Sequence, residues 1–293
     1  MKLSELRITT ICENTSSHIF KLGEWGISFF IEAGEEKILF DTGGGNTLLH
    51  NATTMGLDLA GVDKVALSHG HKDHTGGLKS FLQKVQSTAP GRKVKIYAHP
   101  RVFDAKYIKD DKGNIFYIGM GYVHEELKFL GAEFVMQKDS VEISSDIFIS
   151  GEINQDNDFE VVSEKLLCKD ENGEIVPDPL VDDQSLFIKT EKGLIIVSGC
   201  AHRGIINTIK KGQRVTGQSE VFMVIGGTHL EGAGEEQFEY TVDELKKLGV
   251  KKLGVSHCTG LKKASRLHSI FGDDVFFYNN AGTVIDFVNQ DYF

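Results

Sequence analysis

Short apolar runs alternate with amphipathic stretches through the first half of the chain. Runs rich in Ile, Leu, Val and Phe are typical of strands, and they occupy residues 6–12, 27–32, 37–40, 65–68 and 93–97. After the run at 65–68, Leu78, Phe81, Leu82 and Val85 recur at the i, i+3, i+4, i+7 spacing of a helix with one buried face. The pattern therefore predicts strands interrupted by helices.

The second half shows the same alternation. A helix is predicted at 123–130, where Gly131 would end it, and short strands are predicted at 133–136 and 147–150. A hairpin is predicted at 185–190 and 194–198, followed by a helix that carries Ile205, Ile206 and Ile209 and ends at Gly212. Further strands are expected at 221–225 and 252–256, and further helices at 235–248 and 262–271. Sheets flanked by helices on their outer faces make a layered α/β protein.

Composition limits the class of protein. The chain has 293 residues, of which 40% are hydrophobic and 25% charged, as in an ordinary globular protein. A net charge of −10 argues against a nucleic-acid partner, which would require clustered Lys and Arg. No run approaches the ~18 apolar residues of a membrane span, and no apolar leader is present, so a cytoplasmic protein without a membrane partner is expected. The four cysteines show no C-x-x-C spacing and are expected to be reduced.

The chemistry is concentrated at residues 68–78, Ser-His-Gly-His-Lys-Asp-His-Thr-Gly-Gly-Leu. Three histidines and one carboxylate lie within six residues, between a predicted strand and a predicted helix. Neutral imidazoles and a carboxylate are the ligands that divalent Zn or Fe prefers. A solvated His-rich turn is the simpler alternative, but the strand-to-helix setting favours a metal site.

This segment resembles the signature of the metallo-β-lactamase superfamily, H-x-H-x-D-H on a strand-to-helix turn. Residues 38–43, with their Asp-x-Gly turn, and residues 255–260 resemble two further superfamily motifs. Residues 199–205, 226–230 and 256–260 resemble the dihydropteroate-synthase-like branch of methanopterin synthesis, and the similarity extends from about residue 10 to residue 285. The resemblance implies a four-layer αββα sandwich. It would form a single domain over residues 1–293, with an insert at about 101–181.

The resemblance also implies a set of metal ligands. His69 and His71 would serve one ion, Asp73 and His74 a second, and His257 would be the last ligand. Cys200 stands where the superfamily usually has a bridging Asp, and a thiolate there would favour Zn. His202 could bind from the same turn. One or two Zn²⁺ ions are therefore expected, with Fe or Mn as alternatives.

One superfamily feature is missing, because no Gly-His turn occurs in the middle of the chain. Either Glu152 supplies an oxygen ligand in its place or His202 supplies the nitrogen. His229 and His99 each follow a predicted strand, so a role facing the substrate and a structural hydrogen bond both remain open. Asp41, at a strand end, is expected to orient the ligand histidines. Cys258, next to His257, is expected either to pack or to support the ligands without binding the metal itself.

A metal with an open position lowers the pKa of water from ~16 to about 7, so metal-activated water or Lewis-acid catalysis is expected, with Asp73 as the catalytic carboxylate. The resemblance implies a hydrolase or transferase for a small phosphorylated or pterin-like substrate, with or without release of pyrophosphate. A di-iron protein that handles oxygen or nitric oxide is an alternative, although 293 residues leave no room for the flavin domain that such proteins usually need. A non-catalytic metal-binding sensor is the third hypothesis.

The segment 101–181 is the part least like the superfamily core. Because loops on a rigid scaffold commonly set specificity, it is expected to roof the metal cleft, with Tyr107, Phe116 or Tyr117 forming an apolar wall. The alternative is that these aromatic side chains form the interface of a homodimer.

Overall fold

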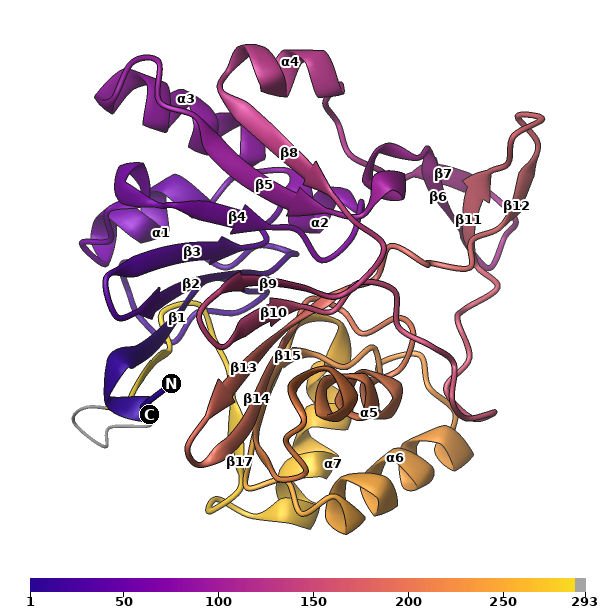
Figure 1. The fold of residues 1–293 in the computed structure, drawn as a ribbon. Helices are drawn as coiled ribbons and strands as arrows, with labels where there is room; N and C mark the ends of the chain where they lie inside the picture. Colours follow the sequence, from indigo (N-terminus) through magenta and orange to yellow (C-terminus); the bar gives the residue numbers. More distant parts are fainter. Residues whose placement is uncertain (288–293) are drawn as a thin grey trace.

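The computed structural model describes residues 1–287, and its central feature is a pair of seven-stranded mixed sheets packed face to face (Figure 1). The first sheet has the order β18 (Val284–Asp286), β1 (Leu6–Cys12), β2 (Ser28–Ala33), β3 (Glu36–Phe40), β4 (Lys64–Ala66), β5 (Val94–Ala98) and β8 (Ala132–Met136). Strands β3, β4, β5 and β8 run parallel, so their carboxyl ends lie at one edge of the sheet.

The second sheet repeats this arrangement with later parts of the chain. Its order is β17 (Phe276–Tyr278), β16 (Lys252–Ser256), β15 (Val221–Gly227), β14 (Gly193–Ser198), β13 (Ser185–Thr190), β10 (Ile147–Ile149) and β9 (Val141–Ser144). Strands β14 to β17 are parallel, and the remaining pairs are antiparallel.

Helices cover the outer face of each sheet (Figure 1). Those on the first sheet are α1 (Leu48–Thr54), α2 (Lys72–Thr75), α3 (Leu78–Thr88) and α4 (His124–Phe129). Those on the second are α5 (Ile205–Thr216), α6 (Glu235–Lys247) and α7 (Leu261–Phe271). Short 3₁₀ turns occur at Leu3–Glu5, Leu59–Gly61, Pro100–Phe103 and His257–Thr259. The predicted four-layer αββα sandwich is confirmed.

The side-chain pattern of the strands explains the layers. In β2, Phe29 and Ile31 pack into the core between the sheets, whereas Phe30 packs under the helices of the first sheet. In β14, Ile195 and Val197 likewise face the central core, whereas the alternate residues face the core beneath α5 to α7. Because successive side chains of a strand point to opposite faces, a strand that is apolar throughout is stable only when both faces are covered.

A third, four-stranded sheet lies beside the sandwich (Figure 1). It consists of two hairpins, β6 (Lys106–Lys109) with β7 (Ile115–Tyr117), and β11 (Leu166–Lys169) with β12 (Ile175–Pro177). The tips have similar sequences, Lys-Asp-Asp-Lys-Gly-Asn-Ile at 109–115 and Lys-Asp-Glu-Asn-Gly-Glu-Ile at 169–175. Within the segment 101–181, β8, β9 and β10 belong to the large sheets, so the two hairpins are separate excursions from them.

The helix expected to end at Gly212 continues to Thr216, so that boundary was wrong. A Cβ on Gly212 would lie 2.9 Å from the Leu194 side chain and 3.1 Å from Phe187, so glycine is used here for close packing against the sheet. The helix ends instead at Gly217, whose left-handed φ of 69° suits glycine. In residues 1–287, no helix is both long and apolar enough to cross a membrane.

Candidate metal centre

The predicted site residues follow the carboxyl ends of strands in both large sheets. Asp41 follows β3, the histidine motif follows β4, Cys200 follows β14, His229 follows β15 and His257 follows β16. The turns there are sharp. Asp41 (φ 57°), Ala201 (φ 55°), His229 (φ 51°) and His257 (φ 52°) all adopt the left-handed conformation that side chains other than glycine rarely adopt. Strain of this kind is concentrated at functional sites.

Three histidines form the first part of the cluster. The His69 Nε2 atom lies 2.9 Å from His71 Nδ1 and 3.3 Å from His202 Nε2, although His202 is 133 residues away in the sequence. All three side chains are buried. Burial, followed by the neighbouring imidazoles, holds the pKa of His69 and of His202 well below the usual value. Burial also lowers the pKa of His71 to about 3, so the rings are neutral and can act as metal ligands.

The second part combines the carboxylate of the motif with two further histidines. Asp73 Oδ2 lies 3.3 Å from His257 Nε2 and 3.9 Å from His74 Nε2. Burial alone would raise the pKa of Asp73, but His74 and His257 outweigh it and hold the pKa below its usual range. His257 is oriented by Asn14, whose Oδ1 atom lies 2.9 Å from His257 Nδ1. Asp73 is therefore a carboxylate anion facing two imidazoles.

Cys200 connects the two parts, since its Sγ atom lies 3.1 Å from His74 Nε2. In residues 1–287, five groups of three potential ligands have donor atoms within 4.8 Å of one another, and Cys200 belongs to three of them. The groups are His69/His74/Cys200, His69/His71/His202, Cys200/His257/Cys258, Cys200/His202/His229 and Asp73/His74/His257. The thiol thus occupies the position expected of a bridging ligand.

Asp41 lies behind the cluster. Its Oδ2 atom is 2.7 Å from His74 Nδ1 and accepts a hydrogen bond of 2.6 Å from Ser68 Oγ. Burial lowers the pKa of His74, but Asp41 and then Asp73 outweigh it and raise the pKa to about 9. A carboxylate on the far nitrogen fixes the ring orientation and leaves Nε2 directed at the ligand position.

The structure does not bring Glu152 and His99 into the cluster. They contact each other instead, with His99 Nε2 3.1 Å from Glu152 Oε1, and the Glu152 side chain is 41% exposed. Neither residue belongs to any of the five groups. His202 is therefore the one of the two alternative ligands that lies with the other donors. The His229 ring does lie at the cluster, with its centroid 4.1 Å from that of His202.

Several residues beside the site were not assigned from the sequence. Cys258 was not expected to be a metal ligand, yet its thiol is grouped with Cys200 and His257. Asp183 is buried, and burial raises its pKa to about 7. Asp182 accepts a hydrogen bond from the backbone N–H of Gly70 in the histidine turn, and Lys106 donates to its other oxygen. The acidic pair Asp182-Asp183, one residue before an apolar strand, was the available signal, because carboxylates at a strand boundary require partners when they are buried.

The arrangement fits divalent metal ions. Donors around a tetrahedral zinc at ~2.1 Å lie about 3.4 Å apart, close to the separations of 2.9 to 3.9 Å within this cluster. In addition, His202 Nδ1 and His229 Nδ1 are buried without a hydrogen-bond partner among residues 1–287. Buried polar atoms rarely remain unpaired in a protein, so these nitrogens suit a site that takes a ligand or ion.

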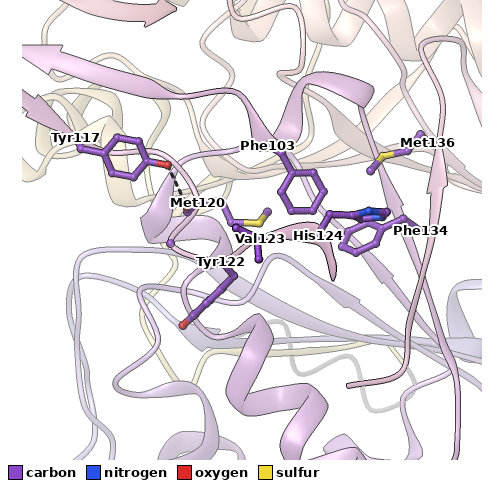
Figure 2. A pocket seen from close by; sticks show the side chains of 9 residues that line it. Phe103, Tyr117, Met120, Tyr122, Val123, His124, Phe134 and Met136 are labelled. Atoms are coloured by element: carbon purple, nitrogen blue, oxygen red, sulfur yellow. Dashed lines mark hydrogen bonds between the residues drawn. The ribbon is translucent and has the colours of Figure 1, made fainter. Parts of the chain in front are cut away.

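Two cavities lie near the cluster. The first, of about 300 Å³, reaches the metal-site residues His202 and His229, and residues 160–164 form part of its wall. The second is a wider apolar hollow of about 690 Å³, in which Phe103, His124 and Phe134 lie together and Tyr117 stands at the far side (Figure 2). Its wall is attached to the histidine turn, because Lys72 N donates to Ile118 O and Tyr122 Oη donates to Gly76 O.

The aromatic residues that were expected to roof the metal cleft lie in different places. Tyr117 lines the apolar hollow, and the Tyr107 ring packs edge-on against it with centroids 5.5 Å apart. Phe116 lines neither cavity and is 53% exposed. Residues 160–164, which also belong to the 101–181 segment, are the ones that border the cavity at the histidines.

Comparison with known proteins agrees with this geometry. Residues 27–140 match the family model of the metallo-beta-lactamase superfamily. A Methanocaldococcus jannaschii protein is 35% identical over 98% of both chains and is named 7,8-dihydropterin-6-methyl-4-(beta-D-ribofuranosyl)-aminobenzene-5'-phosphate synthase. A crystal structure of a metal-dependent hydrolase of the beta-lactamase superfamily matches with a TM-score of 0.79 and 27% identity, over 95% of this chain and 98% of the other.

A more distant structure, the metallo-beta-lactamase fold protein YhfI from Bacillus subtilis, has a TM-score of 0.57 and 13% identity over 95% of this chain and 98% of its own, a likeness of fold alone. The resemblance noted in the histidine motif is thus supported over nearly the whole length of the chain. The chain belongs to the metallo-β-lactamase superfamily and is a metal-dependent enzyme of that fold.

Proposed function

We propose that this protein is a zinc enzyme with up to two ions that acts on a small phosphorylated or pterin-like molecule, by hydrolysis or by transfer with release of pyrophosphate. The observation that carries the proposal is the pair of donor groups joined at Cys200 and bordered by a cavity at His202 and His229. Sulfur among the donors favours zinc over manganese, which prefers oxygen ligands.

The substrate class is supported by the Methanocaldococcus jannaschii relative, whose name describes the synthesis of a phosphorylated pterin compound. The cavity of about 300 Å³ is at the lower end of the range found for small-molecule sites. It combines apolar side chains such as Leu230 with polar ones such as Gln237. Such a lining can hold a ring while a polar group reaches the histidines.

Bound zinc with an open position would supply water activated at neutral pH and would polarise a phosphoryl or carbonyl oxygen. His69, His71 and His202 would hold one ion, and Asp73, His74 and His257 the other, with Cys200 between them. The Asp73 side chain is 17% exposed, more than His74 and His257 beside it. Because Asp73 is anionic, we propose that it orients the attacking water and accepts its proton.

The alternative of a di-iron redox protein is less well supported, because a buried thiol lies in the middle of the donors. A non-catalytic sensor is disfavoured by the cavity, since a structural metal site is usually closed. We also propose a cytoplasmic location, because all four thiols are unpaired. The exposed edge strand β7 is proposed as the contact of a homodimer.

The test is metal analysis of protein purified without added metal, combined with assays of pyrophosphate and phosphate release. The substrate panel would include phosphorylated and diphosphorylated pterins, simple phosphomonoesters and a β-lactam. We expect bound zinc, release from a pterin ester and little β-lactam hydrolysis. The variant His71→Ala serves as the inactive control. Absence of bound metal would refute the proposed metal enzyme, and activity confined to the β-lactam would refute the substrate class.

A further inference from the structure

Two thiols lie together on one side of the metal centre. Cys200 follows β14 and Cys258 follows β16, so the two turns flank the end of β15 in the second sheet. Both side chains are buried, and the Cys258 thiol donates to the backbone oxygen of Cys200 at 3.4 Å. The two Sγ atoms and a ring nitrogen of His257 lie within 4.8 Å of one another.

The surroundings of Cys258 favour its sulfur atom as an acceptor. The backbone N–H of His229 donates to Cys258 Sγ at 3.3 Å. At Gly227 a Cβ would lie only 2.7 Å from the same sulfur. Glycine at this position therefore leaves the space that the sulfur occupies. A hydrogen bond from a backbone N–H stabilises an anionic acceptor more than a neutral one. In the metal-free protein the S–H is directed at the Cys200 oxygen; on binding metal the sulfur would lose that proton and keep the His229 N–H as its donor, which suits a ligand better than a packed apolar side chain.

Nitrogen donors without partners lie on the same side. His229 is grouped with Cys200 and His202, and the Nδ1 atoms of both histidines are buried without a hydrogen-bond partner among residues 1–287. Two thiols and these imidazoles are more donors than the superfamily motif requires. They also differ from that motif in kind, since sulfur replaces oxygen.

We infer that Cys258 is a second sulfur ligand of the metal centre, and that Cys200 and Cys258 together make it a thiolate-rich site that selects zinc over manganese and iron. This inference rests on the proposed function insofar as the centre must hold metal. Binding of one Zn²⁺ by the two thiols would release two protons and leave two Zn–S bonds. No oxidant or reductant is needed. The preference follows from the affinity of soft ligands for zinc.

X-ray absorption of the reduced zinc protein tests the inference without any variant. Zinc–sulfur bonds of ~2.3 Å are resolved from zinc–nitrogen and zinc–oxygen bonds of about 2.0–2.2 Å. Because a bridging Cys200 contributes one zinc–sulfur bond to each of two ions, the bonds are counted against the zinc content: we expect about three per protein with two ions bound, or two with one ion bound. Two bonds with two ions, or one bond with one ion, would leave Cys200 as the sole sulfur ligand and overturn the inference. Protein without any bound metal would instead overturn the proposed function.

A cobalt titration of metal-free protein, kept reduced, assigns the sulfur atoms. The variants are Cys258→Ser and Cys200→Ser, with Cys168→Ser as the matched control, because Cys168 is a buried thiol outside all five groups. The near-ultraviolet sulfur-to-cobalt band should lose part of its intensity in each of the first two variants, more in Cys200→Ser if Cys200 bridges two ions, and none in the control, because each thiolate contributes its own transitions. An unchanged band in folded, cobalt-loaded Cys258→Ser would overturn the inference.

Discussion

The carboxylate of Asp182 accepts a hydrogen bond from the backbone N–H of Gly70, in the middle of the histidine turn, at 3.0 Å. Its other oxygen and the carboxylate of Asp178 each accept a hydrogen bond of 2.8 Å from Lys106 Nζ. All three charged side chains are buried, and Lys106 belongs to β6 of the small sheet. The small sheet is therefore joined to the metal-binding turn by a buried ion cluster.

The variant Lys106→Met should be strongly destabilised, because it leaves two buried carboxylates without their cation. Removing one partner of a buried ion pair costs roughly 3–5 kcal/mol in the free energy of unfolding, measured by urea denaturation. Lys165→Met is the control, since Lys165 pairs with Asp111 at the surface and such pairs contribute about 1 kcal/mol or less. Equal stability of the two variants would show that the buried cluster does not hold the turn.

Zinc content separates the two ligands that the sequence left as alternatives. His202→Ala should lose an ion or bind it far more weakly, because His202 Nε2 lies 3.3 Å from His69 Nε2. Glu152→Ala should keep its full zinc content, because Glu152 contacts His99 instead. Elemental analysis after dialysis measures both, and loss of metal from Glu152→Ala alone would reverse the assignment.

The layered α/β class and the histidine motif could be predicted because both depend on local patterns, whereas the four-layer arrangement was implied by the family resemblance. Apolar runs such as β2 and β14 and the His-x-His-x-Asp-His spacing are visible within a few residues. The choice between Glu152 and His202 could not be made, because it depends on which strand ends adjoin in the folded sheets. Cys258 was not counted among the ligands for the same reason, since its nearness to Cys200 follows from the order of β14, β15 and β16.

The small sheet shows a second limit of prediction from the sequence. Its four strands were not predicted, because strands of three or four residues are too short to show a reliable period. Gly212 was misread because glycine ends many helices, and its packing against Phe187 is a tertiary contact that propensity does not report.

Asp73→Asn should keep the fold and lose turnover by at least about 100-fold, because the amide cannot accept a proton or act as an anionic ligand. Steady-state kinetics on the substrate that the screen identifies, together with zinc analysis, measures the effect. Asp63→Asn is the matched control, since Asp63 forms its ion pair with Arg92 instead. Full turnover with full metal content would limit Asp73 to a structural role.

Asp183 should make the metal-free protein less stable as the pH rises. Burial raises its folded-state pKa from 3.8 to about 7, so the folded state binds the proton more tightly than the unfolded state does. Stability from this group is complete below about pH 4 and is lost as the pH rises to about 7. Relative to the wild type, Asp183→Asn should therefore gain about 2–3 kcal/mol between pH 5 and pH 8.

Urea unfolding of both proteins in the presence of a chelator measures that difference. Comparing two pH values cancels any cost of the amide that does not depend on pH. A constant difference between the two proteins would show that Asp183 is ionised in the folded state at both pH values.

A variant in the exposed strand β7 can show whether this strand forms a homodimer contact or a lid over the substrate. It is an edge strand of the small sheet, and Ile115, Phe116 and Tyr117 are each about half exposed. An edge strand with apolar side chains is a ready site for pairing with another chain, and Phe116 lines neither cavity. Phe116→Ser should therefore convert a dimer to a monomer in light scattering while kcat and KM stay unchanged. Phe129→Ser, an 89% exposed phenylalanine on α4, should leave the mass unaltered. An unchanged mass with a much higher KM in Phe116→Ser would instead support a lid over the substrate, because loss of an apolar wall weakens substrate binding without separating two chains.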